Sequence, residues 1–220
     1  MEIKEISKYL SNEGDNTLVL KDKNFTNEKF SDFTLRPVGQ EKIEILDVIL
    51  DGCSVKNGTS VIRKGVVLKS VTFKDFTCGD ALHISSEVSM SDVKIIGKNK
   101  PAMVWVKSQY EDLKEDTPYN NNHITLDISN YFGEVSITGI PASSVKRNPQ
   151  EHIVLSVDLL EKVDWKGLGF SPLSYWKLMA KKVLSAKAKD GVFSLPPKSG
   201  KNYERSMSEL DILKKEGFVC

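Results

Sequence analysis

The sequence predicts a mainly β fold in which short parallel strands coil into a solenoid. Between residues 17 and 106, apolar residues come in runs of three or four that are rich in β-branched and aromatic side chains, and turn residues separate the runs. A four-residue pattern also recurs: a bulky apolar residue, any residue, Asp or Gly, and an apolar residue. Its copies lie at residues 30–33, 50–53, 73–76 and 90–93, so they start 20, 23 and 17 residues apart. A spacing near 20 residues suits one copy per solenoid turn.

The shortness of the strands is the second reason to expect a solenoid. Strands of three or four residues bury little in isolated hairpins, whereas stacked turns bury the inward side chains of each strand on those of its neighbours. A Greek-key β-sandwich also has many short strands separated by turns, and it stays open as the alternative. The recurring Asp or Gly favours the solenoid.

The N-terminal residues 2–10 are expected to form a short helix. Ile3, Ile6, Tyr9 and Leu10 would lie on one side of it, and Gly14 would stop it in a left-handed conformation. Such a helix would cover the open apolar end of the first turn, as caps do in repeat proteins.

An acidic stretch without an apolar period interrupts the strands at residues 108–122. Long loops in compact domains are usually functional or disordered, and loops on a rigid scaffold often carry binding residues. Strand patterns then return, so residues 1–160 are expected to form one solenoid domain with its N-terminal cap. The acidic residues predicted to contact a partner are Glu111, Asp112, Glu115 and Asp116.

Residues 161–220 are expected to form a helical appendage packed on the solenoid. Ser171 can cap a helix that begins at Pro172 and runs to about Ala188, and Ser206 or Ser208 can cap a shorter one. This part of the chain has 12 Lys and Arg against 7 Asp and Glu. The lysines predicted to contact a partner are Lys177, Lys181 and Lys182.

The composition narrows the classes of partner and location. A formal net charge of +1 gives no reason to expect nucleic acid or an acidic membrane. The start of the chain lacks the apolar core of a signal peptide, and no apolar run of about 18 residues occurs, so a cytoplasmic protein is expected. Cys53 and Cys78 stand at apolar positions and are interpreted as buried thiols, not as a disulfide.

No catalytic site, metal site or cofactor is expected. His83, His123 and His152 each precede an Ile at the start of a strand and are interpreted as ordinary strand-edge residues. The aspartates of the recurring pattern return in copy after copy, which is typical of turn residues bonded to nearby backbone amides. Motifs of nucleophiles, phosphate-binding loops and dinucleotide sites are absent from the sequence.

Through its short strands and its Asp- or Gly-containing repeat, the stretch 17–160 resembles the right-handed parallel β-helix proteins and the related pentapeptide-repeat proteins. It differs from the latter in lacking a strict five-residue period, and from the polysaccharide-cleaving enzymes of this fold in lacking an isolated catalytic cluster. Small bacterial chains of this type look like immunity proteins, which bind and block a toxin of interbacterial competition. The resemblance thus implies a non-catalytic protein that binds a partner protein, with the acidic stretch facing a basic toxin surface.

Two other functions stay open. A carbohydrate-active enzyme of this fold would use a pair of carboxylates, for which Asp75 and Asp92 are the candidates. A structural subunit of a fibre or phage is the other possibility.

Overall fold

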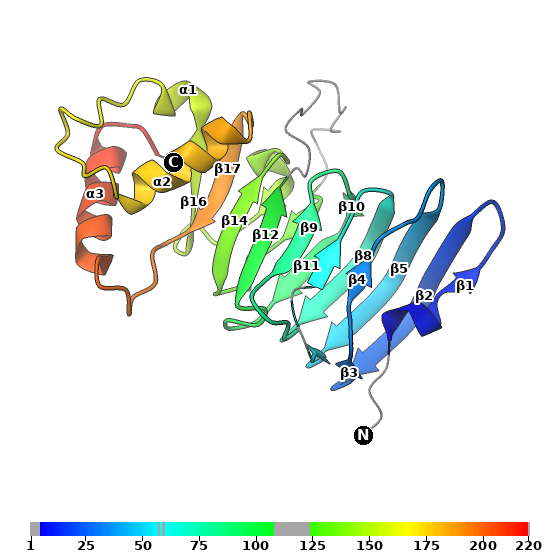
Figure 1. Ribbon diagram of the computed structural model, residues 1–220. Helices are drawn as coiled ribbons and strands as arrows, with labels where there is room; N and C mark the ends of the chain where they lie inside the picture. The colour runs from blue at the N-terminus through cyan, green and yellow to red at the C-terminus, as the bar shows by residue number, and fades with distance from the viewer. Residues whose placement is uncertain (1–4, 57, 59, 108–123, 220) are drawn as a thin grey trace.

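A computed structural model describes residues 5–56, 58, 60–107 and 124–219. The strands form a parallel β-solenoid of about 5 turns (Figure 1). A helical unit, coloured yellow to red, lies at the end of the solenoid opposite to the blue strands β1 and β2. Successive turns pair in parallel, which excludes the Greek-key sandwich and confirms the predicted fold class.

The first sheet contains the longest strands. They pair in parallel along the solenoid, and one turn takes about 22 to 25 residues in the first half of the chain. A short strand, β1, is antiparallel to β2 at the outer edge, and β10 pairs beside β8. The strands are β1 (Ser11–Asn12), β2 (Thr17–Thr26), β5 (Lys42–Asp51), β8 (Val66–Lys74), β10 (Ser89–Ser91), β11 (Val93–Ile96), β13 (Leu126–Asp127) and β15 (Val145–Lys146).

The second sheet runs the length of the solenoid and continues into the helical unit. Its parallel part is β4 (Thr34–Leu35), β7 (Ser60–Ile62), β9 (Leu82–Ser85), β12 (Met103–Lys107) and β14 (Glu134–Thr138). Two antiparallel strands, β17 (Asp190–Ser194) and β16 (His152–Ser156), extend it beyond β14. A small third sheet pairs β3 (Lys29–Phe30) with β6 (Ser54–Val55).

The core of the solenoid is a stack of inward side chains. Its N-terminal half is rich in aromatic residues, whose rings meet edge to face with centroids 4.9 to 6.0 Å apart. Cys53 and Cys78 are free thiols buried in this core, as expected, and burial raises the pKa of both. The rings belong to Tyr9, Phe25, Phe30, Phe33, Phe73 and Phe76.

The strands of the first sheet are longer than the sequence indicated. The runs at 43–45 and 48–50, expected as two strands, are both part of β5, and the runs at 66–68 and 71–73 are both part of β8. Between the runs, Asp47 and Ser70 have positive φ angles of 54° and 53°. Each bends its strand while pairing with the next turn continues on both sides. Asp47 and Ser70 therefore bend continuous strands, and they do not separate two strands as the sequence pattern indicated.

The recurring Asp pattern does not occupy one fixed place in each turn, so that interpretation was wrong. Ser91 pairs with Lys69, which puts Asp92 beside Ser70. Asp51 pairs with Lys74, which puts Asp75 beside Gly52. Each turn of the solenoid therefore bends at two different places, which we call corners, and both take a residue in the left-handed conformation. Asp, Asn and Gly are the residues that adopt this conformation most readily.

The N-terminal cap is a single turn of 3-10 helix, η1 (Ile6–Tyr9). Ile6 is buried in the solenoid core, and the Tyr9 ring packs edge-on against Phe25 with centroids 4.9 Å apart. Ile3 of the predicted helix lies outside the described residues. The segment covers the first turn, as expected of a cap.

The helical unit has a core of its own. The helical unit contains α1 (Val157–Leu160), α2 (Tyr175–Ser185) and α3 (Tyr203–Lys215). A short 3-10 turn, η2 (Ala142–Ser144), belongs to the solenoid and precedes β15. The parallel turns end at β15, and Ile153 and Leu155 on β16 already pack with Trp176 of α2. The domain boundary at residue 160 stays a prediction.

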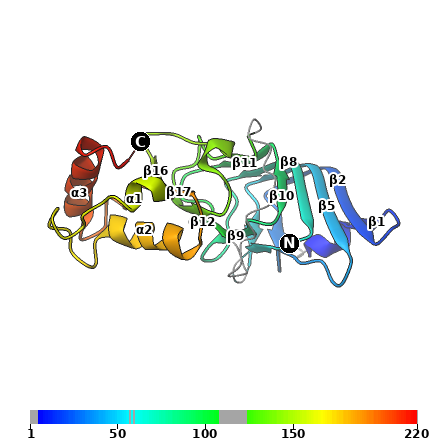
Figure 2. The same cartoon turned by 90° about the horizontal axis from the view of Figure 1, so that it is seen from above.

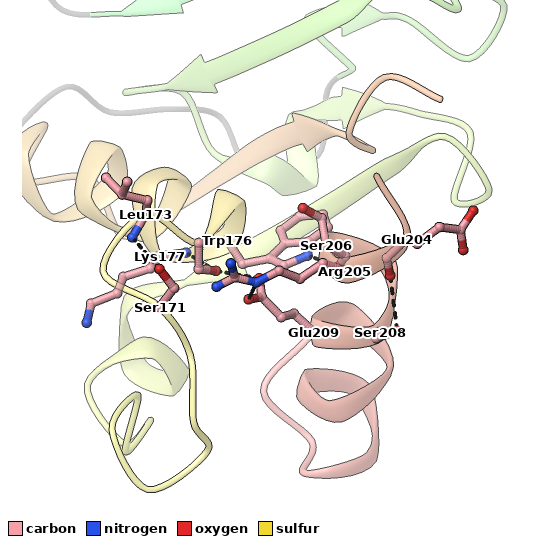
Figure 3. Close-up of polar contacts among 10 residues, drawn as sticks. Ser171, Leu173, Trp176, Lys177, Glu204, Arg205, Ser206, Ser208 and Glu209 are labelled. Atoms are coloured by element: carbon pink, nitrogen blue, oxygen red, sulfur yellow. Dashed lines mark hydrogen bonds and ion pairs between the residues drawn. The ribbon is translucent and has the colours of Figure 1, made fainter. Parts of the chain in front are cut away.

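The predicted N-caps of the two long helices were wrong. α2 begins after Ser174, whose Oγ accepts the Lys177 N–H at 3.4 Å, whereas the Ser171 Oγ accepts the Leu173 N–H at 3.2 Å (Figure 3). α3 begins after Asn202, so Ser206 and Ser208 lie within it. The Trp176 Nε1 donates to the Ser206 carbonyl at 2.6 Å and so ties α2 to α3.

Candidate binding surface

The four acidic residues predicted to contact a partner, Glu111, Asp112, Glu115 and Asp116, lie outside the described residues, as does His123. Their role stays a prediction. The three lysines lie on α2, where the structure separates them.

Lys177 and Lys181 share the flank of α2 that also carries the exposed Leu184. Lys182 lies on another flank, which faces the solenoid. Burial lowers the pKa of Lys182; the nearby Glu134 on β14 raises it, and Lys107 on β12 lowers it. The charges acting on Lys182 therefore come from the second sheet, and it belongs to a different surface from the other two lysines.

The outer face of the second sheet carries helix α2 at its β16–β17 end. α2 packs on β16 and β17, where Trp176, Met179 and Val183 meet Ile153 and Phe193. Figure 2 shows the C-terminal end of α2, coloured orange, directed toward the solenoid. Farther along the same face, His83 on β9 and Trp105 on β12 are half-buried. Their sequence neighbours Leu82, Ile84, Val104 and Val106 are buried in the solenoid core, so the His83 and Trp105 side chains point outward.

Trp105 is held between a histidine and a cation. His83 and Trp105 are directly paired residues of adjacent strands, and their ring centroids lie 4.6 Å apart with planes tilted by 52°. The Lys107 Nζ stands 4.0 Å from the centroid of the Trp105 ring, which is a cation–π contact. We call His83, Trp105, Lys107 and the neighbouring Arg63 the Trp105 platform.

The electrostatics of the platform are cationic. Burial lowers the pKa of His83, as do the charges of Lys107 and Arg63, while Asp80 acts in the opposite direction. The imidazole is therefore neutral at pH 7 and stacks as an aromatic ring. Lys182 of α2 adds a further positive charge at the edge of the platform, beside Glu134.

A metal-binding cluster and a pair of carboxylates are two arrangements typical of catalytic sites. Within the described part of the chain, no group of three or more His, Cys, Asp and Glu residues could hold a metal ion. Asp75 and Asp92 lie at different corners: Asp92 stands beside Ser70, five residues before Asp75, which is roughly 16 Å along a strand. Paired carboxylates of glycosidases lie within about 10 Å of each other, so these two do not form such a pair.

Sequence reasoning missed Trp105, Lys107 and Arg63. The signal for the first of them is the 22-residue separation of His83 and Trp105, which equals one turn here. That signal has meaning only once the register of the turns is known.

Comparison of the chain with protein-family models, with curated proteins and with solved structures gave no significant match. Among the described residues, no helix is long and apolar enough to span a membrane.

Proposed function

We propose that this chain is a non-catalytic protein-binding scaffold whose partner contacts the Trp105 platform. The observation that carries the proposal is the half-buried Trp105 ring, held between His83 and Lys107 on the outer face of the second sheet. Trp and Arg are the residues most enriched among the energetically dominant contacts of protein interfaces.

The platform is rigid before any partner arrives. β9 pairs with β7 on one side and β12 on the other, and β12 pairs with β14, so the backbone under His83 and Trp105 is fixed. The two ring contacts hold the Trp105 side chain. Ordering costs on binding are therefore small, which favours affinity.

The charges support a partner that carries carboxylates. Arg63, Lys107 and Lys182 outnumber Asp80 and Glu134 on and beside the platform. Carboxylates on the partner would pair with these cations at the rim, while an apolar or aromatic side chain would rest on the Trp105 ring. We further propose that the partner is a toxin of interbacterial competition, which would make this chain a cytoplasmic immunity protein. The support for this more specific proposal is the family resemblance described above.

The test compares three variants with the wild-type chain. Affinity capture from the native cells identifies candidate partners, and the affinity of each purified candidate is then measured by calorimetry. Trp105→Ala and Lys107→Glu should each weaken binding at least about tenfold, because a central aromatic and its cation are lost. Lys69→Glu makes the same charge change on the exposed face of the first sheet and should leave the affinity unchanged. Full affinity in both platform variants for every candidate would refute the proposal.

A further inference from the structure

We propose that the junction between the solenoid and the helical unit opens as the pH falls, and that opening moves α2 away from the Trp105 platform. The second half of this inference rests on the proposed function, since it concerns the regulation of that same surface. The first half stands on the junction alone.

The junction consists of β16 and β17, whose two faces pack against different cores. Ile153, Leu155 and Phe193 point toward the helices and belong to the core of the helical unit. Val192 and Val154 point the other way and pack with the solenoid core. Because side chains alternate along a strand, His152, Asp190 and Ser194 also lie on the side that faces the solenoid.

His152 is the unusual residue of this face. It is 1% exposed, and neither of its ring nitrogens has a hydrogen-bond partner. The Nε of Arg147 is likewise buried without a partner. Buried nitrogens that lack a partner favour any opening that hydrates them. The closed junction therefore holds three unsatisfied nitrogens that an open junction would satisfy.

Acid increases the preference of His152 for the open, hydrated junction. Burial is the main cause that lowers the pKa of His152 to about 4, and the positive charge of Arg147 lowers it further. The Asn148 carbonyl near the ring raises this pKa, although its geometry is not that of a hydrogen bond. In the open junction the imidazole would titrate near its ordinary pKa of about 6.5. A group whose pKa is depressed in the closed state binds its proton more tightly in the open state. The closed junction therefore loses stability as the pH falls from about 6.5 toward 4.

A second titratable group on this side of the strands acts in the opposite direction. The Asp190 Oδ1 accepts the Ala142 N–H at 2.9 Å, and burial raises the pKa of this carboxyl, so its protonation opposes opening. The Ser194 Oγ accepts the Val135 N–H at 3.2 Å and does not titrate. The charged residues of α1 and α2 lie on the opposite side of β16, with the helices.

The junction sets the geometry of the binding surface. Trp105, Lys107 and Glu134 belong to the solenoid, whereas Lys182 belongs to α2, which packs on β16 and β17. The two parts meet beside Glu134, whose charge acts on Lys182 and on Tyr175 of α2. Opening at β17 would carry Lys182 away and leave the platform without the charge at its edge.

Hydrogen exchange tests the junction without a partner. Amide protection of β16 and β17 is measured at pH 7 and pH 5 and corrected for the intrinsic exchange rate, with β5 as the internal reference. A pKa change from about 4 to about 6.5 predicts that protection of β16 and β17 falls about 20-fold more than that of β5. His152→Leu should abolish this difference, and Asp190→Asn, which keeps the acceptor for Ala142, should preserve it.

A second measurement applies even if His152→Leu fails to fold. The carbon resonance of the wild-type His152 ring, followed by NMR, should titrate with a pKa near 4. A midpoint near 6.5, or an equal loss of protection in β5 and β17, overturns the pH-dependent junction and leaves the platform proposal intact. Conversely, a Lys107→Glu variant with full partner affinity overturns the proposed function, whatever the junction does.

Discussion

At the scale of single residues, the buried Glu209 on α3 joins the two long helices. Its Oε2 accepts the Ser174 hydroxyl at 2.6 Å, and its Oε1 accepts the Arg205 Nε–H at 3.1 Å (Figure 3). The same contact fixes the Ser174 side chain that caps α2. Ser171 and Ser174 both have suitable side chains, and the choice between them depends on a carboxylate 35 residues away. This is why sequence reasoning found the helix and misplaced its start.

Replacing Glu209 should destabilise the helical unit. Glu209→Ala leaves the buried Ser174 hydroxyl without its acceptor, so the free energy of unfolding should fall by about 2 kcal/mol. Urea unfolding followed by tryptophan fluorescence measures the change. Glu204→Ala removes an exposed carboxylate from the same helix and should cost less than about 0.5 kcal/mol. Identical midpoints for the two variants would show that Glu209 does not hold the helices together.

At the scale of elements, the solenoid is shaped by left-handed residues stacked at its corners. The register puts Asp22, Asp47, Ser70 and Asp92 in one column, all with φ between 53° and 54°. A second column contains Asn27, Gly52, Asp75 and Gly97. The strand runs were predictable from their side chains. The strand lengths and the register were not, because Asp, Asn and Gly mark both corners alike and only pairing between turns tells them apart.

The second column offers a test of this stacking. A Cβ at Gly52 would meet the Asn27 side chain of the preceding turn, and its φ of +64° disfavours other residues. Gly52→Ala should lower the free energy of unfolding by about 2 to 4 kcal/mol, from backbone strain and the clash together. Gly39 has the same φ and no atom within 4 Å, so Gly39→Ala should cost only about 1 kcal/mol. Adding Asn27→Gly to Gly52→Ala removes the clashing side chain and suits the φ of 54° at position 27, so it should bring the loss down to about that of Gly39→Ala. No recovery would mean that the turns do not touch there.

At the scale of the whole molecule, the fold class and the order of its parts could be predicted, and the candidate surface could not. The helical appendage and the N-terminal cap followed from helical periodicity, whereas the predicted capping residues were wrong. Trp105 and His83 become neighbours only through the register of β9 and β12. Lys182 and Lys107 come together only because α2 packs on strands added to the solenoid sheet. Such contacts depend on tertiary packing, which leaves no local pattern in the sequence.

The central claim, that a partner protein rests on the Trp105 platform, is tested most directly by site-specific photo-crosslinking in the native cells. A photoreactive amino acid replaces Val61, a half-buried residue paired with His83 on the same face, and in a matched chain it replaces Thr72 on β8 of the first sheet. We predict that one partner crosslinks from position 61 and not from position 72, and that Lys107→Glu reduces its yield at least about fivefold, since the cation at the ring is lost. Equal crosslinking from both positions, or a yield at position 61 that Lys107→Glu leaves unchanged, would contradict the claim.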